Sequence, residues 1–265
     1  MAKNFLKSES AVSEVVGFIF VFSIVMLAIS VIYAVGYPAI QSSKENTQFQ
    51  NMEQSFMVLQ SNINTVAFGQ APGRTLETSL GGGSITVNSN KGSIIVEKTG
   101  GGEWYSGTLG AIEYEKEGRS IAYEGGGVWK KYPAGAALKI SEPRIFVHNT
   151  SDGNRTVFVS IINISSENGI SSVGGEGTAS VVVRSKPSTY PLNITYLSTG
   201  SGPGDTVNIT VTSDYADAWE RYFKGIIDPN DPADGVDPGS DDEVTATFWC
   251  HTLVVNEYVI DVEVS

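Results

Sequence analysis

The chain has 265 residues, with 17 Lys or Arg against 29 Asp or Glu, and a formal net charge of −12. This acidic balance argues against a nucleic-acid-binding protein, which would carry a basic surface. The single Cys excludes an intramolecular disulfide framework and a cysteine-rich zinc site, and the two His residues lie far apart in the sequence.

A long apolar stretch follows the short polar N-terminus. Residues 15–40 contain no charged side chain, and the segment VVGFIFVFSIVMLAISVIYAV is apolar apart from two Ser and one Tyr. Because a helix rises 1.5 Å per residue, about 20 residues cross a hydrocarbon core about 30 Å thick. We therefore predict a membrane-spanning helix, with Tyr33 and Tyr37 near its far interface and a bend near Pro38.

Basic residues indicate the orientation of this span. Lys3 and Lys7 precede it and favour a cytoplasmic N-terminus, whereas Lys44 lies just beyond it and weakens the asymmetry. The alternative is a cleaved secretory signal with a small-residue site at 34–36. Ordinary signals have apolar regions of only about 7–15 residues, so a retained span is favoured.

The sequence ESAVSEVVGF, at residues 9–18 and directly before the apolar run, resembles the start of archaeal type IV pilin-like proteins. The resemblance implies that a prepilin peptidase cuts between Ala11 and Val12 and that the apolar helix is retained. Ser10 departs from the family, which often has a charged residue there. Glu14 would be the third mature residue, whereas bacterial pilins have a Glu at the fifth; it either pairs with a neighbour's α-amino group or is solvated at the interface.

The next segment, residues 41–66, is polar overall but carries an apolar stripe. The stripe residues recur every three or four positions, as on one face of a helix: Phe49, Met52, Phe56, Leu59 and Ile63. We predict an amphipathic helix over 38–68. Its stripe packs either on the chain's own β domain or on another subunit in a filament.

From about residue 75 the apolar residues alternate with period two, which is typical of strands. The predicted strands are 84–88, 93–98, 111–115, 120–123, 156–164, 179–185, 192–197, 205–212, 244–255 and 258–264. Residues 88–92 predict a hairpin turn between the first two strands. Triple glycines at 81–83, 100–102 and 125–127 predict turns or bulges.

One helix is predicted among the strands, at 213–225. Ser213 is the expected N-cap, and Gly225 is expected just past the C-terminal end. The aromatic residues of this segment share one face, which we interpret as a core-packing face: Tyr215, Trp219, Tyr222 and Phe223.

An acidic loop follows at 228–243, with seven carboxylates and no Lys or Arg. Clustered oxygen ligands suit Ca²⁺, although the loop lacks EF-hand spacing because Pro232 falls where a ligand belongs. The loop is either a solvated acidic segment or a calcium site. The candidate ligands are Asp228, Asn230, Asp231, Asp234 and Asp237.

Five Asn-X-Ser/Thr sequons lie in the C-terminal part of the chain, which favours a glycosylated exterior location. The acceptor residues are Asn149, Asn154, Asn163, Asn193 and Asn208. Cys250 and His251 are adjacent in a predicted strand and point to opposite faces, so they form no dyad, and Cys250 is expected to be buried. No catalytic constellation is found, and we expect no enzymatic activity and no cofactor other than calcium.

These observations predict an α+β protein, with a long N-terminal helix followed by a mostly antiparallel, sandwich-like β domain. Its parts are a leader at 1–11, the apolar helix at 12–37, the amphipathic helix at 38–68 and an extracellular domain at 75–265. Residues 111–133 and 205–225 also resemble a family of archaeal surface proteins with pilin-like N-termini. We expect a membrane-anchored subunit that assembles with related subunits; the alternative is a non-polymerising surface protein with a binding or adhesion domain.

Overall fold

The computed structural model describes residues 5–99, 101–151, 153–167, 169–186, 193–197 and 205–265. Contacts divide the chain into two compact units, Met1–Asn51 and Met52–Ser265. The first unit is helical, whereas the second contains the end of the same helix and all of the described strands. The coarse prediction of an N-terminal helix followed by a mostly antiparallel β domain is therefore confirmed.

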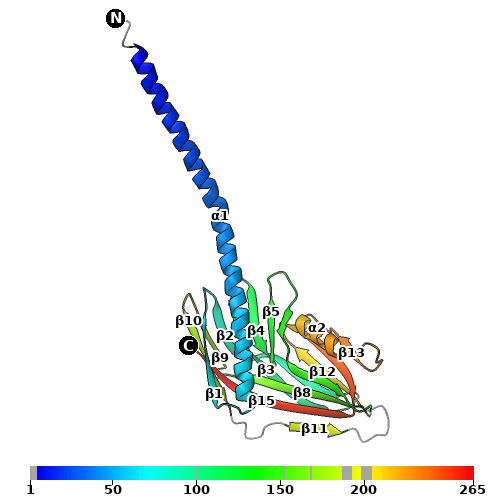
Figure 1. The fold of residues 1–265 in the computed structure, drawn as a ribbon. Coiled ribbons are helices and arrows are strands. Elements are labelled where there is room, and N and C mark those ends of the chain that lie inside the picture. Colours follow the sequence, from blue (N-terminus) through cyan, green and yellow to red (C-terminus); the bar gives the residue numbers. More distant parts are fainter. Residues whose placement is uncertain (1–4, 100, 152, 168, 187–192, 198–204) are drawn as a thin grey trace. The chain divides into compact units, whose positions relative to one another are not determined.

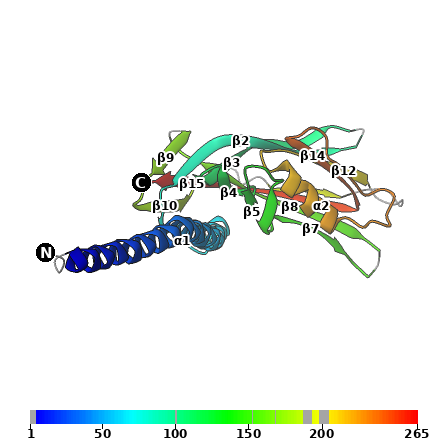
Figure 2. The ribbon, with the colours of Figure 1, turned by 90° about the horizontal axis from the view of Figure 1, so that it is seen from above.

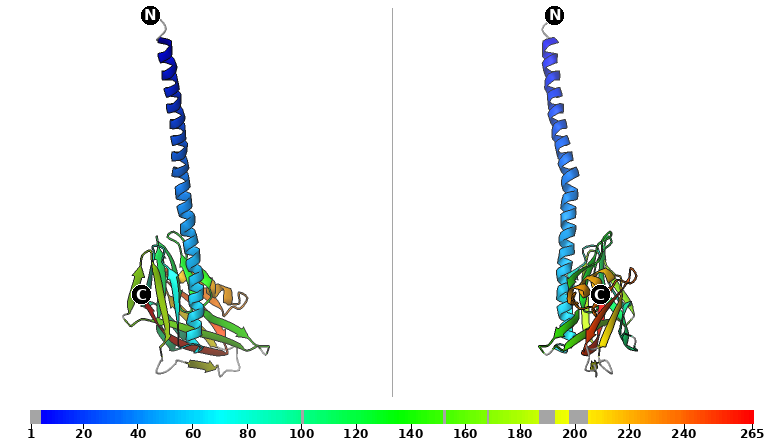
Figure 3. Two further views of the ribbon diagram at one scale, coloured as in Figure 1. Left: turned by 60° about the vertical axis from the view of Figure 1, so that its left-hand side comes forward. Right: turned by 90° about the vertical axis from the view of Figure 1, so that its right-hand side faces the viewer.

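The N-terminal helix α1 runs unbroken over Phe5–Ala67 and has Pro38 inside it (Figure 3). Proline removes one backbone hydrogen bond to the preceding turn, yet the helix continues on both sides of it. The apolar and amphipathic segments predicted separately thus form one element.

The first sheet contains the C-terminal strand at its centre. Its strand order is β1 (Gly73–Ser79), β10 (Thr178–Ser185), β15 (Thr252–Val264), β8 (Arg155–Ser165) and β7 (Arg144–Asn149). A further strand, β11 (Asn193–Leu197), pairs with the first half of β15. The pair β15 and β8 is parallel, with Thr252 opposite Thr156, and the two strands lie side by side in Figure 1.

The second sheet is antiparallel in every described pair. Its strand order is β13 (Gly235–Asp237), β14 (Glu243–Cys250), β12 (Asp205–Thr212), β2 (Ser84–Lys98), β3 (Glu103–Lys116), β4 (Arg119–Glu124), β5 (Gly127–Lys131) and β6 (Leu138–Ser141). Strand β9 (Ile170–Gly174) pairs with the first part of β2.

Two predicted strand boundaries are wrong. No hairpin turn forms at residues 88–92, because β3 pairs with β2 on both sides of that segment and the extra residues form only a register shift. Similarly, the predicted strand 244–255 is divided at His251, since β14 belongs to the second sheet and β15 to the first. The alternation of apolar residues is the same in both sheets, so the sequence does not reveal where the chain passes from one sheet to the other.

Side chains from both sheets form one buried cluster. Strands β12 and β14 bury every second residue, as their period-two pattern predicts. Val157 and Val159 of β8 and Leu253 of β15 join them from the first sheet. The predicted burial of Cys250 is confirmed, and that burial raises the pKa of its thiol to about 12, so the thiolate is disfavoured.

The last four turns of α1 belong to the second unit and pack within it. Met52, Phe56, Leu59 and Ile63 of the predicted stripe are each at most 2% exposed. Gln60 extends from the same segment and donates hydrogen bonds through Nε2 to the carbonyl oxygens of Gly126 (2.7 Å) and Glu142 (3.0 Å). Of the two predicted alternatives for the stripe, this part packs on the chain's own β domain rather than on another subunit.

Helix α2 (Ala216–Ile226) packs its aromatic face into the core, as predicted. It lies beside β13 and β14 (Figures 1 and 2). Both predicted helix boundaries are wrong: Tyr215 is the N-cap and makes no capping bond through its side chain, and the helix continues through Gly225 to a C-cap at Ile227. Ser213 instead donates its hydroxyl hydrogen to the buried carboxylate of Glu124 (2.6 Å).

Candidate functional site

The apolar part of α1 exposes its side chains on all sides. Among the helices that the structure describes, it is the one long and apolar enough to cross a membrane, and its most apolar window has no buried residue. Ser23 and Ser30 donate their hydroxyls to the carbonyl oxygens of Ile19 (2.7 Å) and Met26 (2.8 Å), which satisfies these polar groups within the helix. This surface needs either lipid or other apolar side chains around it.

The predicted processing site lies at the start of this helix. Ala11 and Val12 fall within α1, and their side chains lie outside the described part of the chain. Cleavage between them is tested by neither the fold nor any described contact, and it stays a prediction.

The five sequon asparagines have different environments. Asn149 and Asn154 are exposed beside the turn that joins β7 to β8. Asn163 is half-buried and accepts a hydrogen bond from the backbone N–H of Gly110 (3.0 Å). Asn208 is half-buried and accepts hydrogen bonds from Thr99 and Thr247 (both 3.1 Å). Asn193 begins β11, and its side chain lies outside the described residues. Among the four sequon side chains that the structure describes, Asn149 and Asn154 are the most accessible; glycosylation itself stays a prediction.

The acidic loop folds around a buried arginine. Arg155, at the start of β8, is 3% exposed and forms a two-pronged ion pair with Asp234, whose side chain is fully buried. The Oδ2 atom of Asp231 lies 3.6 Å from the same guanidinium, and its carboxylate also accepts a hydrogen bond from the indole of Trp249. The guanidinium lies 5.3 Å from the centre of the Trp249 ring, while His251 accepts a hydrogen bond from the Arg155 backbone.

Of the remaining calcium candidates, Asp228 and Asp237 bind the loop's own backbone, and Asn230 donates a hydrogen bond through Nδ2 to Oδ1 of Asp228 (3.3 Å). Asp228 accepts a hydrogen bond from the backbone N–H of Asn230 (2.9 Å), and Asp237 accepts one from Gly239 (3.0 Å). Within the described ranges, no group of three or more His, Cys, Asp or Glu residues is placed to hold a metal ion. The structure thus brings Asp231 and Asp234 together around a cation supplied by the protein itself, a role for Arg155 that sequence reasoning missed.

A second buried acid, Glu124, was not found from the sequence. It ends β4, is fully buried, and its Oε1 accepts hydrogen bonds from Ser213 (2.6 Å) and from the indole of Trp219 (3.1 Å). Its Oε2 has no hydrogen-bond partner among the described residues. Burial raises the pKa of this carboxyl to about 7, even though the hydrogen bonds from Ser213 and Trp219 lower it.

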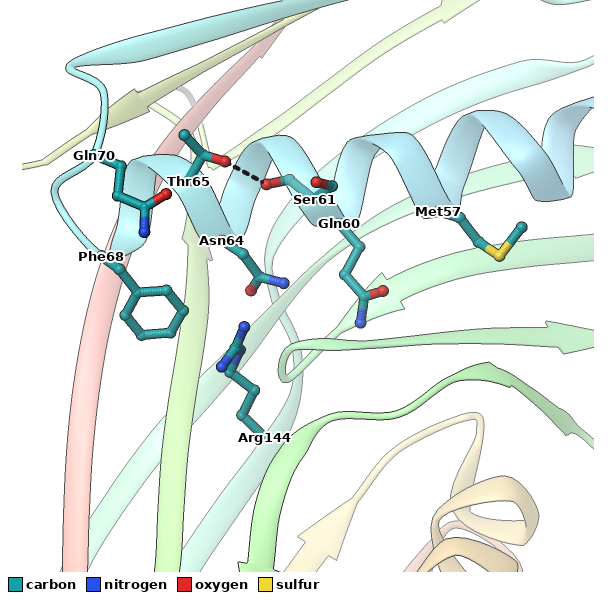
Figure 4. A pocket seen from close by; sticks show the side chains of 8 residues that line it. All are labelled: Met57, Gln60, Ser61, Asn64, Thr65, Phe68, Gln70 and Arg144. Atoms are coloured by element: carbon teal, nitrogen blue, oxygen red, sulfur yellow. Dashed lines mark hydrogen bonds between the residues drawn. The ribbon is translucent and has the colours of Figure 1, made fainter.

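The end of α1 lines an open polar pocket of about 300 Å³ within the second unit (Figure 4). Its lining residues are Met57, Gln60, Ser61, Asn64, Thr65, Phe68, Gln70 and Arg144. Figure 4 shows the side chains of Asn64 and Arg144 pointing toward one another. The guanidinium of Arg144 lies 4.6 Å from the centre of the Phe68 ring, and this ring forms a T-shaped pair with Tyr258.

The fold and its exposed apolar helix define a protein with an N-terminal helical segment able to span a membrane and a mostly antiparallel β domain. A family of unknown function, DUF7289, matches residues 11–264, and the chain belongs to this family. Two uncharacterized proteins of Archaeoglobus fulgidus are similar to it: one is 26% identical, covering 82% of this chain and 84% of the relative, and the other is 24% identical, covering 86% and 87%. No solved structure matches.

Proposed function

We propose that this protein is a pilin-like structural subunit of an archaeal cell surface. Its apolar helix anchors it in the membrane and, after leader removal, assembles with the helices of identical or related subunits. The sandwich-like β domain faces the exterior, where it carries glycans, and the role is structural rather than catalytic. A prepilin peptidase and the lipid bilayer are its expected partners, and nucleic acid is not among them.

The observation that carries this proposal is the uncharged apolar surface of α1 over residues 15–40, none of which is buried. The family match covers this helix as well as the β domain, which supports a retained helix over a generic signal that is discarded. A bilayer and a bundle of apolar helices both shield the same surface from water, so a subunit can move from one to the other.

N-terminal sequencing of the protein from the cells that make it tests the processing step. We expect the native chain to begin at Val12, with the apolar helix retained. An intact leader would instead identify a plain single-pass anchor carrying a binding or adhesion domain. A chain that begins beyond Pro38 would contradict both roles, because the anchoring surface would be lost.

Shearing the cells then tests assembly. A filament subunit is released by shear into a fraction that sediments at high speed, whereas a monomeric anchor stays with the membranes. A variant with Phe18→Asp and Ile24→Asp, which places carboxylates on the apolar surface, should be absent from the sheared fraction.

A further inference from the structure

The pocket at the end of α1 carries a positive charge in a strongly acidic protein. Arg144 is exposed, and in the described part of the chain it takes part in no ion pair. Glu142, two residues earlier, pairs instead with Lys139 (2.6 Å). The lining contains no acidic side chain, so the pocket favours an anion.

The guanidinium is also held in place. It stacks on the Phe68 ring at 4.6 Å, and that ring is itself fixed by its edge-on contact with Tyr258 at 5.0 Å. A planar guanidinium held in this way offers parallel N–H donors that match the two oxygens of a carboxylate. The face of Phe68 is covered by Arg144, so the aromatic ring orients the cation rather than forming the floor of the site.

The other lining groups are neutral hydrogen-bonding groups on one helix face. Gln60, Ser61, Asn64 and Thr65 recur at helical spacing, and Gln70 follows after the helix ends. Gln60 and Thr65 are already engaged, the latter with the backbone oxygen of Ser61 (2.8 Å). Asn64 is different, because its Oδ1 is buried without a hydrogen-bond partner among the described residues and its side chain points toward Arg144 (Figure 4).

We propose that this pocket binds a uronic acid unit of an acidic glycan. The sugar carboxylate pairs with Arg144, and its hydroxyl groups bind Asn64, Ser61 and Gln70. An unpartnered acceptor requires a donor, which a sugar hydroxyl supplies and a bare carboxylate does not. The volume of about 300 Å³ suits a single sugar ring rather than a protein segment. This inference does not depend on assembly into filaments.

The test is calorimetry and saturation-transfer NMR on the full chain in amine-oxide micelles, which contain neither sugar nor carboxylate. The probes are D-glucuronate, D-glucose, acetate and inorganic phosphate. We expect glucuronate to bind at least about tenfold more tightly than each of the other three. Absence of glucuronate binding would overturn the proposal. Equal binding of glucose, or of acetate or phosphate, would also overturn it by showing a site without selectivity for an acid or for a sugar.

Three variants locate the site, each compared with the wild type after its melting temperature is checked to be unchanged. Arg144→Gln removes the cation, and Asn64→Asp places a carboxylate opposite Arg144; each should weaken glucuronate binding at least about tenfold. Arg184→Gln makes the same chemical change at an exposed arginine outside the pocket, paired with Glu263, and should leave binding unchanged. Binding that survives both Arg144→Gln and Asn64→Asp would overturn the assignment to this pocket.

Discussion

Among single residues, Glu124 links the protonation state of the protein to its stability. The ordinary pKa of its carboxyl is 4.5 and burial in the fold raises it to about 7, with the charges of Asp214 and Glu113 adding to the effect. The folded state therefore binds a proton that the unfolded state has already released between these two pH values. The contribution of Glu124 to stability is therefore fully present below pH 4.5 and falls as the pH rises to about 7, after which it stays constant.

For the wild type, we expect Glu124 to reduce the free energy of unfolding by about 3 kcal/mol between pH 4.5 and pH 7. Glu124→Gln keeps the acceptor for Ser213 and Trp219 but cannot ionise, so it should lack this loss. Urea unfolding of the full chain in micelles, followed by tryptophan fluorescence across the pH range, measures the difference.

Glu115→Gln is the matched control for this experiment. Glu115 is an exposed residue of the adjacent strand β3, and its substitution should leave the pH dependence of wild type intact. Identical pH profiles for wild type and Glu124→Gln would show that Glu124 does not hold a proton in the folded state.

The ion pair between Arg155 and Asp234 leads to a second prediction. Asp234→Ala should lower the free energy of unfolding by about 3–5 kcal/mol, because it leaves a buried guanidinium without its main partner. Glu263→Ala breaks the exposed pair with Arg184 and should cost less than about 1 kcal/mol. Denaturant titration compares the two, and similar losses would contradict the buried role of the Arg155 pair.

The same arrangement predicts the response to calcium. Because Arg155 binds Asp234 and backbone N–H groups bind Asp228 and Asp237, calcium chloride should leave the melting temperature of the wild type unchanged. Calorimetry of the full chain checks this result. A heat of binding that the wild type shows and Asp231→Asn lacks would contradict this expectation and support a calcium site.

The sequence showed the acidic loop but not Arg155, which lies more than seventy positions earlier and becomes its partner only through the fold.

At the scale of elements, the final turns of α1 bury one face in the core and expose the other to solvent. In its final turns Phe56 is 1% exposed and Val58 is 50% exposed. Phe56→Ala should lower the free energy of unfolding by about 3–5 kcal/mol, since it opens a cavity in the packed core. Val58→Ala should change it by less than about 0.5 kcal/mol. Equal effects would mean that this stripe does not pack in the β domain in solution.

Helices were easier to predict than strand partners. The three- and four-residue spacing of Met52, Phe56, Leu59 and Ile63 identified the buried face directly, because helical periodicity is local. Strand β12 was predicted with its observed bounds, and the β4–β5 turn falls in a predicted glycine turn, with Gly125 and Gly126 at positive φ. In contrast, the bulge in β2 and the change of sheet at His251 depend on which strands pair, and pairing is non-local.

The candidate pocket could not have been predicted for the same reason. Arg144 and Asn64 are separated by eighty positions, and neither belongs to a motif. The sequence does show that residues 57, 60, 61, 64, 65 and 68 share a helix face of mostly polar character. It does not show that an arginine from the start of β7 faces them.

At the scale of the whole molecule, the membrane affinity should belong to the first unit. The full chain is expected in the detergent phase of a Triton X-114 separation, because the apolar surface of α1 requires shielding. A shortened chain that begins at residue 41 keeps every buried residue of the second unit and should move to the aqueous phase. If the shortened chain stayed with the detergent, a surface of the β domain would have to bind the membrane.

The position of strand β15 has a consequence for how the β domain folds. It is last in chain order, yet it lies between β10 and β11 on one edge and β8 on the other. Until β15 is in place, the edges of β10, β11 and β8 that face it lack their backbone hydrogen-bond partners. Completion of the first sheet therefore depends on β15, and a variant that lacks this strand should expose these edges to aggregation and proteolysis.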